Sequence, residues 1–350
     1  MSTVKRSYNW DYLRVLASVA VVMLHVSYSY MGAIPVNGTA FTVMAAYNAL
    51  TRFAVPVFFM MSGLFLLDPV RELSIKDCLK RTGRLFVIFY FWSAFYAFQG
   101  LAVDLITGAE ITQEILDNSM QRFITGHGHM WFMFKLAGYY LMLPFARSIS
   151  ADKVALTWFC GFWMVYRFVI PFVSHWLPLG WFNMWLSQFD FNFMVSYFGY
   201  FFLGYWLKVM DIPQKLQGIL YGLGILSVGG IFAFTVYDSR QMGALCEDWL
   251  TPSSFFPFVF AVSICVFFKY HGNLGTEAFN PIIRKLSQYT LLIYILHPFF
   301  IEKMNLLGIN TNNYNPSWSI PLFTVLITAA CVATAWVIDH IPVLNKVLLK

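Results

Sequence analysis

The apolar part of the chain opens with YLRVLASVAVVMLHVSYSYM, which runs from Tyr12 to Met31. An α-helix of about 20 mainly apolar residues is long enough to cross the hydrocarbon core of a bilayer. The run is longer than the core of a signal peptide, and no convincing cleavage site follows it. We therefore expect a first transmembrane helix that stays in the mature protein.

The composition of the whole chain agrees with this first segment. Of its 350 residues, 59% are hydrophobic and 11% are charged, whereas soluble domains carry roughly 25% charged residues. The net charge of +6 would favour a nucleic-acid partner in a soluble protein, but the Lys and Arg residues lie mostly in short connections, where they report topology. We expect an all-α, polytopic integral membrane protein that is embedded in the lipid bilayer. We expect it to bind no nucleic acid.

Similar apolar segments recur to the end of the chain. We predict about ten transmembrane helices in one transmembrane domain, residues 1–350, with no separate soluble domain. No internal repeat of the kind found in many transporters is visible. The predicted segments are Tyr12–Met31, Tyr47–Leu67, Leu85–Ile106, Met130–Ala146, Val154–Val173, Phe191–Val209, Leu216–Tyr237, Ser253–Phe268, Tyr289–Leu307 and Ile320–Ile341.

Lys and Arg residues alternate between the connections of these segments. Because basic residues gather on the cytoplasmic side of membrane proteins, the pattern predicts that both ends of the chain face the cytoplasm. The predicted outer connections hold only Arg122, Arg240 and Lys303. The predicted inner connections and tails hold Lys5, Arg6, Arg71, Lys76, Lys80, Arg81, Arg84, Arg147, Lys153, Lys208, Lys215, Lys269, Arg284, Lys285, Lys346 and Lys350.

Ionisable side chains within spans are costly and therefore mark functional candidates. Arg14 and His25 are eleven residues apart, so they lie close to one face of the first helix, roughly 16 Å apart along its axis. Burial favours neutral imidazole, the form that accepts a proton, so His25 is a candidate general base. The alternative is structural: Asp11 pairs with Arg14 at the helix end, and His25 is a satisfied interior histidine. The other ionisable residues within spans are Arg52, Lys135 and Arg167.

Two further clusters contain side chains that could bind a ligand or take part in a reaction. Arg81 and Arg84 are three residues apart, so on a helix they share one face and could hold a phosphate group, although most such clusters only anchor a helix at the inner interface. Near the fourth segment, His127 and His129 precede Trp131, but no third or fourth ligand accompanies them. The five cysteines show no metal-ligand spacing either, so we expect no metal site.

Several motifs, taken in order, resemble the membrane acyltransferase family 3. The resemblance spans almost the whole chain. Its first motif is Trp10-Asp11-Tyr12-Leu13-Arg14 with His25 following, and Val15 replaces the small residue usual after the arginine. The later motifs are Val55-Pro56-Val57-Phe58-Phe59-Met60-Met61-Ser62-Gly63, Arg81-x-x-Arg84, His129-Met130-Trp131-Phe132 and Ile293-Tyr294-Ile295-Leu296-His297-Pro298.

The resemblance implies transfer of an acyl group, usually acetyl from acetyl-coenzyme A, to a hydroxyl of a lipid-linked or surface glycan. It implies a multi-pass protein of a bacterial inner or plasma membrane, with acetyl-coenzyme A as donor and no permanently bound cofactor. His25 would be the essential histidine with Arg14 as its partner, and Arg81 and Arg84 would bind the donor. Candidates for holding the thioester carbonyl or the acceptor are Arg52, Lys135, Tyr294, His297, His129 and Trp131.

Two other classes of function stay open at this point. A transporter or flippase of a glycolipid or other anion would use Arg14, Arg52 and Arg167 as an anion path. A non-catalytic subunit of a polysaccharide assembly machine is the second alternative, against which the complete pairing of Arg14 with His25 argues. The sequence leaves the acceptor sugar and a homo-oligomeric state open.

Overall fold

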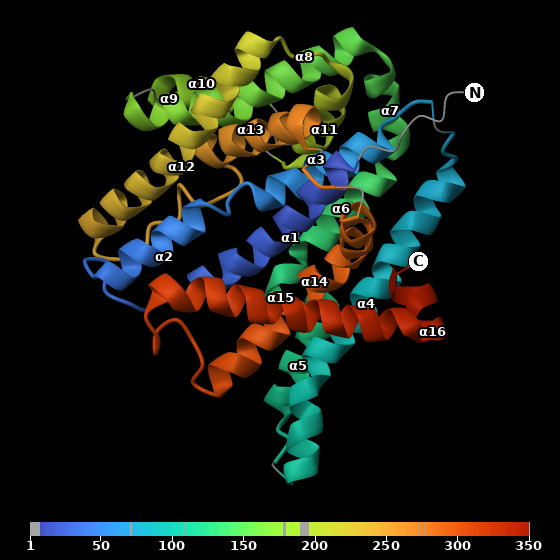
Figure 1. The fold of residues 1–350 in the computed structure, drawn as a ribbon, viewed down its shortest axis with the longest axis vertical. Coiled ribbons are helices and arrows are strands. Elements are labelled where there is room, and N and C mark those ends of the chain that lie inside the picture. The colour runs from blue at the N-terminus through green and yellow to red at the C-terminus, as the bar shows by residue number, and fades with distance from the viewer. Residues whose placement is uncertain are drawn as a thin grey trace. The chain divides into compact units, whose positions relative to one another are not determined.

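A computed structural model of the chain describes residues 8–70, 72–108, 110–177, 180–189, 196–272, 274–276 and 278–349. These residues form helices and connections, and no β-strand occurs among them. The prediction of an all-α protein is therefore confirmed (Figure 1). Lys5, Arg6, Arg71 and Lys350, which entered the topology prediction, lie outside the described residues.

The helices fall into two compact units along the chain. The first unit consists of residues 1–68 and 149–334, and the second of residues 69–148 and 335–350. The first unit contains α1 (Asn9–Tyr28), α2 (Thr39–Ala49), α3 (Ala54–Leu66), α8 (Lys153–Met164), the π-helix η2 (Val165–Val169), α9 (Ile170–Trp176), α10 (Gly180–Leu186), α11 (Phe198–Val209), α12 (Gln214–Met242), α13 (Phe255–His271), α14 (Asn280–Leu306) and most of α15 (Pro316–His340).

The second unit is built on one long helix. Helix α4 (Ile75–Thr107) begins at Ser74, whose side chain and that of Asp77 cap each other's backbone N–H groups, and ends at Gly108 with a positive φ of 72°. The unit also contains α5 (Gln113–Thr125), the 3-10 helix η1 (Gly128–Met130), α6 (Trp131–Leu141), most of α7 (Leu143–Ala151), α16 (Pro342–Leu344) and η4 (Asn345–Leu349).

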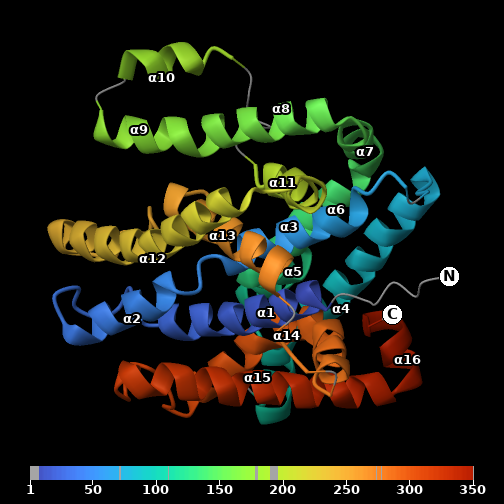
Figure 2. The same ribbon diagram turned by 45° about the horizontal axis from the view of Figure 1, so that its top comes forward.

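Each of the ten predicted segments overlaps one or more helices in the described residues. Six helical stretches there are long and apolar enough to cross a membrane: Asn9–Tyr28, Thr39–Leu66, Ile75–Thr107, Lys153–Trp176, Gln214–Met242 and Pro316–His340. Figure 2 shows that α8 and α9 form one nearly continuous rod, the fourth of these stretches. The chain is thus a multi-pass membrane protein, while the number of ten spans stays a prediction.

Several segment boundaries differ from the sequence-based expectation, and two of the differences have a clear local cause. Helix α4 starts ten residues before the predicted Leu85, because the capping at Ser74 starts the helix ahead of its apolar part. The segment predicted from Met130 to Ala146 is divided between α6 and α7 at Met142. Pro144 lacks the N–H group that would continue the backbone ladder there, which accounts for the break.

Helices α3 and α11 cross with their backbones in close contact. A Cβ atom added at Gly63 would lie 1.7 Å from the carbonyl oxygen of Phe201, and one added at Gly204 would lie 1.8 Å from that of Met60. Only glycine fits at either position. Close backbone approach through small residues is a common way to pack helices in a membrane, where burial from water cannot drive association.

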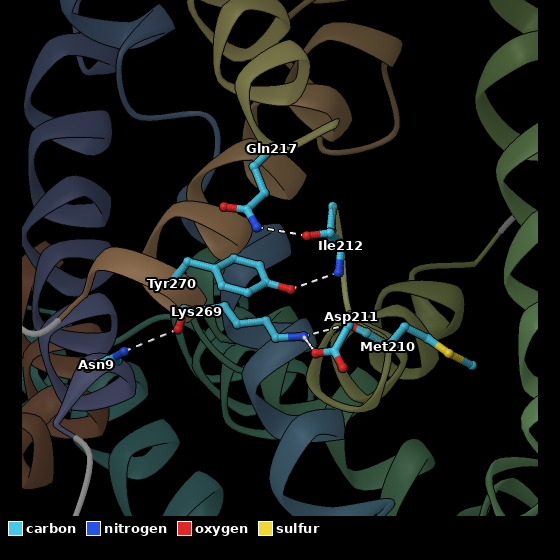
Figure 3. A network of polar contacts seen from close by, with 7 residues as sticks. All are labelled: Asn9, Met210, Asp211, Ile212, Gln217, Lys269 and Tyr270. Carbon is cyan, nitrogen blue, oxygen red and sulfur yellow. Dashed lines mark hydrogen bonds and ion pairs between the residues drawn. The ribbon is translucent and has the colours of Figure 1, made fainter. Parts of the chain in front are cut away.

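Connections predicted to share the inner side are joined at one end of the first unit. Lys269, at the end of α13, donates to the carbonyl of Met210 and forms an ion pair with Asp211 (Figure 3). The ion pair spans 3.9 Å. Asn9, at the start of α1, donates to the carbonyl of Lys269 at 3.3 Å. The Tyr270 hydroxyl accepts from the backbone N–H of Ile212 at 2.7 Å. Lys269, counted as a topology marker, therefore also holds the end of α13 against the connection that follows α11.

Connections predicted to share the outer side are likewise joined to one another. Arg240, near the end of α12, donates to the carbonyl of Val36 at 3.4 Å and to the hydroxyl of Thr42 at 3.1 Å. Tyr47 donates to the carbonyl of Ser317 at 2.8 Å. The alternation predicted from the basic residues agrees with these contacts, while the orientation with both ends in the cytoplasm stays a prediction.

Candidate active site

Helices α1 and α14 pack against each other in the first unit and carry two histidines that meet. His25 lies one turn before the end of α1 and is half-buried. His297 lies in the middle of α14, directly before Pro298, and is 0% exposed. Their ring centroids are 4.7 Å apart, and the Nε2 atom of His297 is 3.2 Å from the Nδ1 atom of His25.

The backbone fixes the tautomer of both rings. His25 Nδ1 lies 2.9 Å from the carbonyl oxygen of Val21, and His297 Nδ1 lies 3.0 Å from that of Ile293. Because a carbonyl oxygen only accepts, the nitrogen that faces it carries the proton. The lone pair of His297 Nε2 then faces the same Nδ1–H group of His25, whose one hydrogen is shared between His297 and the carbonyl of Val21. In neutral His25 the basic nitrogen is consequently Nε2.

A polar side chain on α2 supports the helical turn that carries His25. Asn48 is 0% exposed and donates to the carbonyl of Leu24 at 3.1 Å and to the hydroxyl of Ser27 at 2.9 Å. Its own carbonyl oxygen accepts from Arg52, whose Nε atom lies 2.6 Å away. Sequence reasoning missed Asn48, although a lone asparagine in an apolar segment was a signal that could have found it.

Arg52 links this turn to the connection between α12 and α13, here called loop 243–254. Its Nη1 atom donates to the carbonyl of Leu250 at 2.6 Å. The hydroxyl of Tyr28, at the end of α1, donates to the carboxylate of Glu247 in the same loop. Arg52 was a candidate for holding a substrate, and the structure commits three of its N–H groups to Asn48 and Leu250. In this conformation its contacts position the loop.

The remaining candidates of the first unit lie at different distances from the histidine pair. Tyr294 is close, with its ring centroid 6.3 Å from that of His297. The guanidinium of Arg14 lies over the ring of Phe65 on α3, 5.4 Å from its centroid. The spacing along α1 separates Arg14 from His25 by roughly 16 Å, so these two residues do not meet directly.

In the second unit, Arg81 and Arg84 lie on α4 as the helical spacing predicts. Both are exposed, and together with Asp77 and Lys80 they line a surface hollow of about 310 Å³. Three cations against one carboxylate make this hollow electropositive. Phosphate groups are well matched to such a surface, because guanidinium groups bind them through paired charge-assisted hydrogen bonds.

The other candidates of the second unit surround an aromatic cluster. His129 is buried, its Nδ1 atom lies 2.8 Å from that of His127, and both imidazoles contact the ring of Tyr96. Trp131 and Lys135 are exposed on α6. Throughout the described residues, no group of three or more His, Cys, Asp or Glu side chains is placed to hold a metal ion.

Comparison with known proteins gives one match. A family model described as an acyltransferase domain matches residues 7–340, which is nearly the whole chain and includes residues of both units. No curated protein and no solved structure matches the chain.

Proposed function

Since this chain belongs to the acyltransferase family, we propose that it transfers an acyl group, acetyl in the usual case, from cytoplasmic acyl-coenzyme A to a glycan hydroxyl. The glycan is a cell-surface or lipid-linked one on the other side of the membrane, which is a bacterial inner or plasma membrane. The chain's motifs also resemble those of the short inner-membrane O-acetyltransferase of enterobacterial common antigen.

The observation that carries the proposal is the contact between His25 and His297. A general base needs a lone pair held in one direction, and the two backbone carbonyls and His297 together fix which nitrogen of His25 has it. When His25 accepts a proton at Nε2, its Nδ1–H group faces two acceptors, the carbonyl of Val21 and His297 Nε2, and both stabilise the imidazolium. The arrangement has the same logic as a histidine oriented by a third group in other acyl-transfer enzymes.

The proposed step is direct transfer. His25 Nε2 takes the proton of the acceptor hydroxyl while the hydroxyl oxygen attacks the thioester carbonyl carbon. The new C–O bond forms, the C–S bond breaks, and the leaving coenzyme A thiolate receives the proton from His25. Tyr294, beside His297, is our candidate donor to the developing oxyanion. Arg14, His129, Trp131 and Lys135 stay proposed site residues on the strength of the family motifs and their chemistry.

The donor's phosphates are assigned to the hollow at the start of α4. We expect Arg81→Ala and Arg84→Ala each to weaken acetyl-coenzyme A binding by about tenfold, the lower end for losing a charge-assisted hydrogen bond. The residual binding should depend less steeply on salt. Equilibrium binding to the purified protein at two salt concentrations measures both effects.

Lys76→Ala is the matched control for the basic pair, because Lys76 is an exposed cation of the same helix outside the hollow. It should bind the donor as the unsubstituted protein does. If the two arginine variants behave like this control, the pair only anchors α4 at the membrane surface.

His297 should act as a positioning residue. We expect His297→Leu to lower kcat by about 10- to 100-fold with little change in KM, because a hydrogen bond that stabilises a charge only during the reaction is lost. His297→Gln, which keeps an acceptor near the position of Nε2, should restore most of the activity. Equal losses in the two variants would indicate a packing role instead.

Release of coenzyme A tests the function as a whole. The protein in sealed vesicles of known orientation is given acetyl-coenzyme A on its cytoplasmic side and a glycan acceptor on the other side, and free thiol is measured. All five cysteines are buried, and burial raises the pKa of the Cys246 thiol in loop 243–254, so the protein contributes little background. Passage of intact glycan or donor without thiol release would support the alternative function, a transporter or flippase.

A further inference from the structure

A second polar cavity lies in the first unit, bordered by η2, α9 and loop 243–254. Its volume is about 310 Å³, at the lower end of the range of small-molecule sites. Arg167 lines it from the middle of η2, a π-helix of five residues, and the following Pro171 lines it as well. Single π-turns within α-helices occur frequently at functional sites.

Arg167 is half-buried and belongs to a helical stretch that is apolar enough to span the membrane. In the part of the chain that the structure describes, its guanidinium donates no hydrogen bond and forms no ion pair; its near neighbours are the ring of Phe168 and the hydroxyls of Tyr197 and Tyr200. A charge in this position is costly unless an anion meets it. The cavity beside it provides room for that anion.

The other walls of the cavity suit a sugar. Phe172 and Phe255 stack with centroids 4.4 Å apart and are both partly exposed, giving an apolar face. His175 and Asp248, both exposed, and the hydroxyl of Ser253 supply donors and acceptors. Asp248 also brings a negative charge, so the cavity is not a site for simple anions alone. A ligand with one anionic group, several hydroxyls and an apolar face fits this lining.

Loop 243–254 connects this cavity to the histidine pair. Glu247 accepts from Tyr28 at the end of α1, and Leu250 accepts from Arg52 in the connection between α2 and α3. Asp248 and Trp249, which lie between Glu247 and Leu250 in the loop, line the cavity. One short segment is therefore held against the helix that carries the proposed base and also forms a wall of the cavity.

We propose that this cavity binds an acidic sugar unit, a hexose that carries a carboxylate or a phosphate, with the anion on Arg167. The assignment rests on the proposed function in one respect, namely that the bound sugar belongs to the acceptor glycan. It makes the acceptor an anionic glycan and loop 243–254 part of its binding site.

Binding to the full-length protein in nanodiscs of phosphatidylcholine tests the assignment without any donor. The probes are methyl glucuronide, glucose 1-phosphate, the neutral methyl glucoside and inorganic phosphate. Binding of each probe is measured by the change in tryptophan fluorescence, because Trp249 lines the cavity. We expect at least one acidic sugar to bind about tenfold or more tightly than the neutral one, the effect of a charge-assisted hydrogen bond. Arg167→Gln should remove this preference, and Arg167→Lys should keep part of it.

Arg122→Gln is the matched control, because Arg122 is an exposed arginine on α5 in the other unit; its preference should equal that of the unsubstituted protein. The assignment is overturned if neither acidic sugar is preferred, if Arg167→Gln keeps the preference, or if inorganic phosphate binds as tightly as glucose 1-phosphate. Coenzyme A release without a preference for acidic sugars would contradict this assignment alone, whereas a preference without coenzyme A release would contradict the proposed function alone.

Discussion

Replacing His25 by alanine should abolish acyl transfer in a protein that still folds and inserts. The expected loss in kcat is about 10²- to 10⁴-fold, the contribution of a positioned general base. The physical reason is that His25 Nε2 is the proposed proton acceptor, and alanine has no group that can take up a proton. Coenzyme A release under saturating donor measures the loss, and size-exclusion chromatography with a thermal melt checks the fold.

His25→Gln is the more informative variant, because glutamine is polar and of similar size but takes up no proton near neutral pH. It should be as inactive as the alanine variant. His271→Gln makes the same exchange at an exposed histidine at the end of α13 and should leave activity unchanged. Turnover within a few-fold of the unsubstituted protein in either His25 variant would remove the general-base role.

Replacing Gly63 or Gly204 by alanine should have the largest effect on stability. The added methyl group would overlap a backbone carbonyl of the opposite helix, at 1.7 Å for Gly63 and 1.8 Å for Gly204. A side chain can rotate away, but a helix backbone moves only as a whole, so α3 and α11 must separate. We expect destabilisation at or beyond the upper end of the roughly 1–3 kcal/mol typical of overpacked cores, seen as a lower melting temperature or as loss of folded protein.

Gly222→Ala provides the control for this prediction. Gly222 lies within α12, and an added Cβ would meet nothing within 4 Å, so alanine should be neutral or slightly stabilising through its better helix propensity. If the Gly63 and Gly204 variants melt like this control, the two helices do not cross as closely in the membrane as the structure describes.

The candidate site was predicted from sequence only in part. His25 and His297 were each recognised, one as an ionisable group in a span and the other within a motif, but 272 residues separate them. Nothing in their local patterns shows that α1 packs on α14. Arg52 illustrates the reverse case: the sequence marks it as a candidate for holding the substrate, but only the structure shows that it donates to Asn48 and to loop 243–254.

Properties that depend on neighbours along the chain could be predicted from the sequence. Apolar length produces membrane-spanning helices, and the helical period puts Arg81 and Arg84 on one face of α4. Which helices touch is seen only in the folded chain, as in the contact of His25 with His297 and the glycine crossing of α3 with α11. The cavity beside Arg167 likewise depends on the fold. The physical reason is that lipid-facing and packed apolar residues are alike in composition, so hydrophobicity identifies a span without showing its partner, whereas shape and hydrogen bonds between distant residues select the partner.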